Sequence, residues 1–131
     1  MKKLLSLTLC ALLLMALLPV SAEAPSTPSI TIVVAGNLGD RSFYDSAKGG
    51  IDRLAADFNT VTNVIACQED ASRYESALRE AANNSDIIAA VGWQFYDYLE
   101  DVAEDYPDKK FLFIDNALEE IPANVMCITY K

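Results

Sequence analysis

Residues 30–58 read ITIVVAGNLGDRSFYDSAKGGIDRLAADF, and they contain a complete strand–loop–helix unit. Ile30–Ala35 is a β-branched apolar run, which is typical of a buried strand. The turn-rich stretch Gly36–Ser42 follows it. From Phe43 to Phe58, apolar residues then recur at helical spacing. This order predicts an α/β fold.

The helix expected at 43–58 carries two local signals. Ser42 and Asp45 have the spacing of a capping box, with Asp in place of the usual Glu. Gly49 and Gly50 weaken the helix interior, since glycine costs about 0.5–1 kcal/mol there relative to alanine. We expect that this pair lets the helix pack closely against a sheet.

The same alternation continues to the end of the sequence. Further strands are expected at 61–67, 87–91, 111–115 and 125–130, separated by helices that begin near Ser72 and after Gly92. Most of these strands are continuous apolar runs, as in parallel sheets buried on both faces. Right-handed crossovers then predict a doubly wound, parallel, five-stranded sheet with strand order 2-1-3-4-5. Its switch point would lie between the first and third strands.

Two cysteines test this strand order. Cys67 ends the second strand and Cys127 lies in the fifth, so the order puts them at opposite edges of the sheet. Four strand spacings separate those edges by about 19 Å. Because a disulfide needs Cα atoms within about 7 Å, we predict no bridge between them.

The beginning of the sequence has the parts of a secretory signal peptide. Lys2 and Lys3 precede an apolar stretch, Leu4–Leu18, and small residues allow cleavage after Ala22 or Ala24. That stretch has about 15 residues, fewer than the roughly 20 that cross a bilayer. We therefore expect cleavage, no permanent membrane span, and an exported protein, periplasmic or extracellular and associated with the cell envelope. The expected division is a signal peptide at 1–24, a linker at 25–29 and one folded domain at 30–131.

Composition argues against several classes of function. Loss of Lys2 and Lys3 would leave 8 basic residues against 19 acidic ones. Such a chain repels nucleic-acid backbones and anionic lipid. The sequence has no histidine, which is the commonest general base and zinc ligand. Neither a dinucleotide fingerprint nor a phosphate-binding loop is present. We expect a non-catalytic protein without a cofactor, a metal or a nucleic-acid partner.

Ligands of open α/β sheets gather at the carboxyl ends of the strands, near the switch point. The loops expected there carry the candidate residues Asp40, Phe43, Tyr44, Gly92, Trp93 and Asp115. Asp115 ends an apolar strand, where a carboxylate is costly unless it is paired or solvated in a cleft. This favours a ligand role for Asp115. From the residues alone, Phe43 could equally be a core residue, and Trp93 could wall a pocket or cover the sheet edge.

Three segments resemble signatures of one family. Residues 36–47 (GNLGDRSFYDSA) are similar to G-x-L-G-D-[KR]-S-F-N-[DQ]-S-A. Residues 86–93 (DIIAAVGW) are similar to D-L-I-[IV]-x-[VT]-G-[FY], and residues 107–115 (PDKKFLFID) to P-[DN]-[VTK]-K-F-x-x-[IV]-D. These are signatures of the basic membrane protein family of ABC-transporter solute-binding proteins, which bind purine nucleosides. The resemblance runs from about residue 30 onward and implies a periplasmic-binding-protein-like lobe of type I.

The resemblance implies roles for individual residues. Phe43 would stack on the purine, Asp115 would bind the ribose hydroxyls, and Gly92 would let the backbone approach the sugar. Asp40 would lie beside the cleft. Tyr44 stands where the family has an Asn that hydrogen-bonds the ligand, and a phenol cannot copy the paired donor and acceptor of an amide.

Two other departures from the family concern position 93 and length. Trp93 replaces the family's Phe or Tyr. Family members have two lobes that close around the ligand, and this sequence matches the N-terminal lobe without its last helix or the second lobe. We therefore expect a truncated gene product, a partial chain or an incompletely defined gene.

The expected function is reversible, non-catalytic binding of a small molecule, a purine nucleoside by resemblance. The protein would be the extracytoplasmic component of an ABC importer, with an ABC permease as partner in the full-length form. The alternative is a lone exported α/β domain that self-associates or acts as an adaptor without a transport role.

Overall fold

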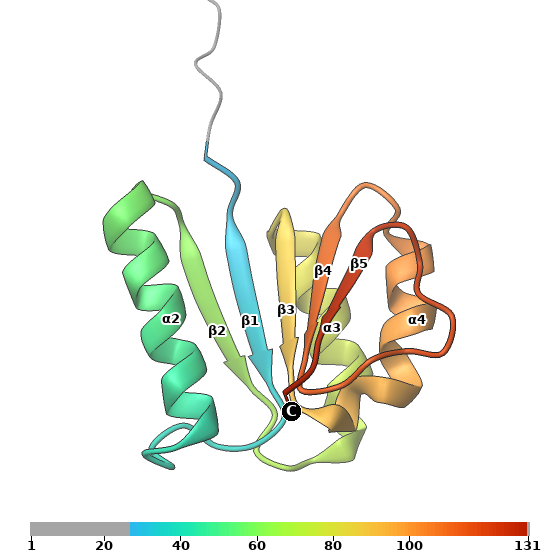
Figure 1. Ribbon diagram of the computed structural model, residues 1–131, viewed down its shortest axis with the longest axis horizontal. Helices are drawn as coiled ribbons and strands as arrows, with labels where there is room; N and C mark the ends of the chain where they lie inside the picture. Colours follow the sequence, from blue (N-terminus) through green and yellow to red (C-terminus); the bar gives the residue numbers. More distant parts are fainter. Residues whose placement is uncertain (1–26, 131) are drawn as a thin grey trace, which may run out of the picture.

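A parallel sheet of five strands forms the centre of the computed structural model, which describes residues 27–130 (Figure 1). Its order is β2-β1-β3-β4-β5, and every neighbouring pair is parallel, so the predicted topology is confirmed. The predicted signal peptide lies outside the described residues. The strands are β1 (Ile30–Val34), β2 (Thr62–Ala66), β3 (Ile87–Val91), β4 (Lys110–Ile114) and β5 (Val125–Ile128).

Three helices connect these strands and cover the two faces of the sheet. They are α2 (Phe43–Phe58), α3 (Tyr74–Asn84) and α4 (Tyr96–Asp105), with short 3-10 turns η1 (Ala71–Arg73) before α3 and η2 (Trp93–Phe95) before α4. In Figure 1 the strands pass in front of α3, while α4 lies to the right of β5 and α2 lies to the left of β2. None of the helices in residues 27–130 is long and apolar enough to cross a membrane.

The two sheet faces are built from alternating residues of the same strands. Val33 of β1 and Phe113 of β4 point to the face covered by α3 and α4, where Leu78 and Leu99 complete a large buried core. Their strand neighbours point to the opposite face and form a smaller cluster with Ile51, the one fully buried residue of α2. This period of two is what a pleated strand imposes.

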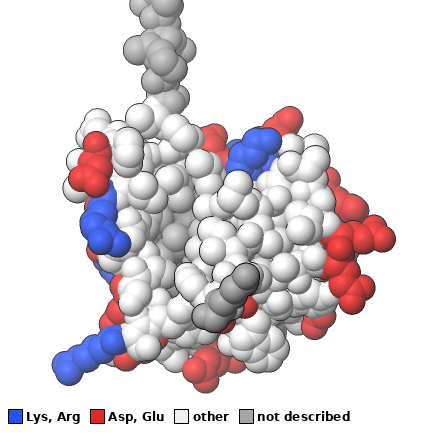
Figure 2. All heavy atoms as spheres, viewed as in Figure 1, with Lys and Arg blue, Asp and Glu red and all other residues white. Residues whose placement is uncertain are grey.

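The α2 face is only partly covered, which corrects the expectation that most strands are buried on both faces. An apolar groove of about 310 Å³ runs between α2 and β4, lined by residues such as Ile32, Leu54 and Leu112. Further along this face, Met126 of β5 is 61% exposed. Figure 2 views this face and shows its middle free of charged side chains, which gather at the margin. A predominantly apolar strand therefore does not by itself establish burial of both faces.

The reason expected for Gly49 and Gly50 is also wrong. A methyl group built on either glycine would meet no atom within 4 Å, so neither glycine is needed for close packing on the sheet. Gly50 instead borders the open groove.

The cysteines behave as the strand order predicts. Cys67 is buried just after β2 and Cys127 is half-buried in β5, at the opposite edge. Both are free thiols. Burial raises the pKa of the Cys67 thiol above its ordinary value, which keeps it protonated and unreactive at neutral pH.

Candidate ligand-binding site

The carboxyl ends of β1, β3 and β4 lie side by side at one end of the sheet, which we call the rim (Figure 1). Backbone hydrogen bonds extend the parallel register past the strand ends. The N–H of Ala35 donates to Val91 O (3.2 Å), and the N–H of Gly92 donates to Ile114 O (3.1 Å). The residues that follow the three strands, among them Gly92 and Asp115, are therefore neighbours at the rim.

Phe43 and Tyr44 reach the rim from the first turn of α2, and Asp40 fixes that turn. Its Oδ1 accepts the N–H groups of Ser42 (2.9 Å) and Asp45 (3.1 Å), and its Oδ2 accepts that of Tyr44 (3.1 Å). These bonds, that from Ser42 first, lower the pKa of the Asp40 carboxyl below its ordinary value. The carboxylate satisfies N–H groups that a helix start leaves without partners.

The predicted capping box is therefore wrong. The Ser42 side chain makes no capping hydrogen bond. The Asp45 carboxylate instead accepts the N–H groups of Gly39 (2.7 Å) and Arg41 (2.8 Å), which braces the loop before the helix. Two aspartates thus hold the loop between β1 and α2 in one shape.

Tyr44 lies across the switch point between β1 and β3. A Cβ built on Gly36 would come within 3.0 Å of the tyrosine Cζ and 3.1 Å of its Cδ2. A Cβ built on Gly92 would lie 3.5 Å from the tyrosine hydroxyl. The ring packs against both core clusters, and its centroid is 5.4 Å from that of Phe43. The phenol therefore forms the floor of the rim, over two glycines that leave room for it.

Gly92 holds a backbone conformation that favours glycine, with φ at +120°. Its built Cβ would also approach Gln94 Oε1 to 2.5 Å and Ala35 Cβ to 3.3 Å. The glycine is buried, whereas the neighbouring Trp93 side chain is 62% exposed. The exposed Trp93 indole thus lies next to Gly92, whose backbone is not covered by a side chain of its own.

Asp115 follows β4 with a φ of +80°, which is uncommon for a residue with a Cβ. Its side chain is exposed, and the ion pairs within residues 27–130 involve other carboxylates. A strained backbone conformation that presents a free carboxylate is a feature of functional sites.

All six predicted site residues therefore belong to segments that end at the rim: the loop before α2 and its first turn, the segment after β3, and the residue after β4. Asp40 differs from the others because its carboxylate already caps α2, and a direct ligand contact by Asp40 stays a prediction. The sequence places Gly36 and Gln94 in loops at this end of the sheet, but it does not predict that Gly36 packs against the Tyr44 ring or that the Gln94 side-chain oxygen is buried. No group of three or more potential metal ligands occurs in residues 27–130.

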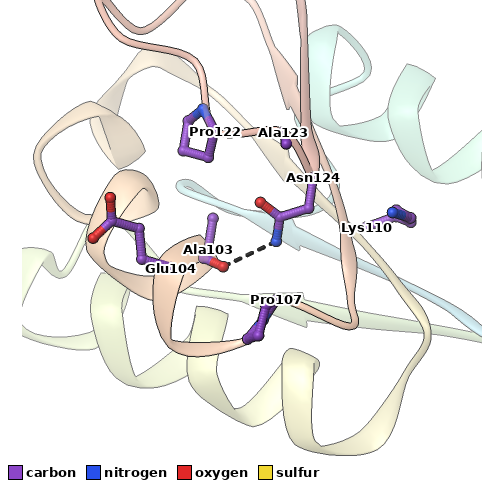
Figure 3. Close-up of a pocket in the computed structure, with 7 residues that line it drawn as sticks. All are labelled: Ala103, Glu104, Pro107, Lys110, Pro122, Ala123 and Asn124. Carbon is purple, nitrogen blue, oxygen red and sulfur yellow. Dashed lines mark hydrogen bonds between the residues drawn. The ribbon is translucent and has the colours of Figure 1, made fainter.

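A hollow of about 200 Å³ lies at the opposite end of the sheet from the rim, between the end of α4 and the start of β5 (Figure 3). The amide nitrogen of Asn124 points across it and donates to Ala103 O (2.9 Å) and Tyr106 O (3.2 Å). These bonds satisfy carbonyls at the end of α4. The Asn124 amide in this hollow thus has a structural task, and the hollow is distinct from the rim.

The family comparison agrees with this geometry. A family described as "ABC transporter substrate-binding protein PnrA-like" matches residues 27–131. The chain belongs to this family. Basic membrane protein A of Borreliella burgdorferi is 27% identical over 107 residues, and Basic membrane protein A2 of Borrelia garinii is 29% identical over 109. Each match covers 79% of this chain and 31% of the relative, so the chain spans about a third of the length of these relatives.

Solved structures show the same fold. A solute-binding protein of an ABC transporter system from Aeropyrum pernix matches with a TM-score of 0.71 and 33% identity, covering 77% of this chain and 28% of that one. A putative lipoprotein fragment from Peptoclostridium difficile matches with a TM-score of 0.70 and 26% identity, covering 79% of this chain and 85% of that one. The predicted family and the solute-binding-protein fold are confirmed. The family description names a binding protein and not an enzyme.

Proposed function

We propose that this chain forms one wall of an extracytoplasmic solute-binding protein, and that the rim binds a purine nucleoside without catalysis. The observation that carries the proposal is that Gly92 and Asp115 follow neighbouring strands at one end of the sheet, where Phe43 packs beside Tyr44, whose hydroxyl lies near Gly92. Support also comes from the family, whose members are substrate-binding proteins of ABC transporters. The partner that receives the ligand would be an ABC permease.

The chemistry of the rim favours a flat ligand that carries hydroxyl groups. Phe43 is half-buried and Trp93 is exposed, so both can offer an aromatic face to a planar ring. The exposed Asp115 carboxylate can accept hydrogen bonds from two neighbouring hydroxyls. Between them, the bare backbone of Gly92 allows close approach. A nucleoside joins a planar base to a sugar with vicinal hydroxyls and satisfies all three groups.

In this proposal Asp40 affects ligand binding indirectly. It holds the first turn of α2, and hence Phe43 and Tyr44, through bonds from the N–H groups of Ser42, Tyr44 and Asp45. Its expected effect on binding comes through the position of the two rings, so Asp40→Asn, which keeps one acceptor oxygen, should weaken binding less than Asp40→Ala.

The proposal is tested by titrating inosine, guanosine and adenosine into the purified chain and following backbone amide shifts by NMR. One wall leaves much of a ligand in water, so we expect dissociation constants in the millimolar range. Asp115→Ala should weaken binding several-fold, because a carboxylate that accepts two hydroxyl hydrogen bonds is lost. The matched control is Glu104→Ala, which removes an exposed carboxylate of α4 at the end of the sheet opposite the rim.

Two results would contradict the proposal. One is the absence of shifts with every nucleoside at 20-fold the expected dissociation constant, that is, at roughly tens of millimolar. The other is an equal effect of the Asp115 and Glu104 substitutions, which would remove Asp115 from the site. The lone-adaptor alternative is not favoured by the family match, which describes a transporter component.

A further inference from the structure

The carbonyl oxygen of the Gln94 side chain is the one buried side-chain polar atom without a hydrogen-bond partner in residues 27–130. Leaving a buried acceptor unpaired is unfavourable, and most buried polar groups in proteins have partners. Gln94 lies in η2, directly after Gly92 and Trp93. The unpaired atom therefore belongs to the rim and not to a distant part of the fold.

The surroundings of this oxygen explain where a partner would come from. Gln94 Oε1 lies 2.5 Å from the point where a Gly92 Cβ would stand, and the Tyr44 hydroxyl lies 3.5 Å from the same point. Both polar atoms thus flank one spot beside the Gly92 backbone at the switch point, which a Cβ could enter only if the Gln94 oxygen moved. Within residues 27–130 the Gln94 oxygen has no hydrogen-bond partner in the protein, so it is available to a third molecule.

We propose that Gln94 is a specificity-determining residue of the rim, whose buried carbonyl accepts a hydrogen bond from an N–H or O–H group of the bound nucleoside. The inference deepens the proposed function and rests on it. The adjacent Tyr44 hydroxyl donates to or accepts from a neighbouring group of the same ligand. Ligands that present a donor to this spot are favoured over analogues in which that donor is absent or methylated, because the latter leave the Gln94 oxygen buried and unpaired.

The test compares wild type, Gln94→Met and a control, Gln68→Met, by NMR titration with inosine. Methionine keeps the length of the side chain and removes the amide, and Gln68 carries the same side chain in an exposed position. We expect Gln94→Met to weaken inosine binding about 3- to 10-fold, the size of one neutral hydrogen bond. We expect Gln68→Met to bind as wild type does.

Two analogues identify the donor. 1-Methylinosine lacks the base N–H, and 2′,3′-dideoxyinosine lacks the 2′- and 3′-hydroxyls, while both analogues keep the 5′-hydroxyl. For the analogue that lacks the donor received by Gln94, wild type and Gln94→Met should bind equally, because the interaction is already absent. For the other analogue the difference between wild type and variant should persist.

Thermal unfolding without ligand separates this role from a structural one. Because Gln94→Met removes an unpaired acceptor, the Tm should stay the same or rise. A fall in Tm with unchanged inosine affinity overturns the inference and makes Gln94 a structural residue. Equal inosine binding by wild type and Gln94→Met also overturns it while the proposed function stands. If wild type binds no nucleoside, the proposed function and this inference fail together.

Discussion

Replacing Gly92 by alanine tests the architecture of the rim without any ligand. The backbone at Gly92 has a φ of +120°, and holding a residue with a Cβ there costs about 1–3 kcal/mol. The new methyl group would also stand 2.5 Å from Gln94 Oε1, the end of a flexible side chain that can move aside, and 3.3 Å from Ala35 Cβ, so overpacking adds about 1 kcal/mol. Alanine restricts the unfolded chain, which offsets about 0.4–1 kcal/mol.

The net expectation is a loss of about 1–4 kcal/mol in the free energy of unfolding. For a domain of this size that corresponds to a fall in Tm of at least about 4 °C. Urea unfolding followed by far-ultraviolet circular dichroism measures it, as a lower midpoint with an unchanged slope. Adding Gln94→Ala to Gly92→Ala should recover part of the loss, because the clash disappears and the backbone strain remains.

The matched control is Gly49→Ala. Gly49 lies inside α2, is exposed, and has no atom within 4 Å of a built Cβ. Alanine there should raise stability by about 0.5–1 kcal/mol, the difference between the two residues in a helix interior. If Gly92→Ala is as stable as wild type, or if the two substitutions shift the midpoint in the same direction, the rim geometry described for Gly92 is refuted.

Two further predictions concern charge. The carboxyls of Asp40, Asp70 and Asp86 have pKa values below the ordinary 3.8, because N–H or hydroxyl groups donate to them in the folded state. A lowered folded pKa stabilises the fold above about pH 3.8 and the stabilisation is lost as pH falls through the folded values, so acid unfolding should begin below about pH 4 and Asp86→Asn should flatten that dependence. Inosine monophosphate should bind more weakly than inosine, since the chain has a net charge of −9 and Asp40 and Asp115 stand at the rim. The difference should shrink as salt is added, and stronger binding of the monophosphate at low salt would contradict this electrostatic reasoning.

The strand order was predictable because the relevant signals are strong and independent. The apolar runs at 87–91 and 111–115 overlap β3 and β4, and the helical stripe at 43–58 coincides with α2. Right-handed crossovers then leave few ways to arrange five parallel strands. The same order separates Cys67 from Cys127. Convergence of the strand ends at one rim follows from parallel pairing alone.

Details that depend on competition between neighbouring side chains were not predictable. Asp40, Ser42 and Asp45 all carry oxygen acceptors near the start of α2, and spacing does not determine which of them caps it. The position of Tyr44 over Gly36 depends on packing across β1 and β3, which no local pattern encodes. Gln94 is likewise an ordinary polar residue in the sequence, and only the burial of its oxygen distinguishes it.

Uncovered surface is a third kind of feature that sequence patterns do not reveal. Met126 and Ile128 belong to an apolar strand, yet they are 61% and 39% exposed on the α2 face. Hydrophobicity records the tendency of a residue to be buried, and whether burial occurs depends on what packs against the sheet.

The most direct measurement is a map of amide shifts on adding inosine to the isotope-labelled chain. The account predicts that the largest shifts cluster at the rim, at Gly36, Phe43, Gly92 and Asp115. The amide of Asn124, at the opposite end of the sheet, should stay unchanged. Shifts centred on Asn124, or spread evenly over both ends of the sheet, would contradict the account.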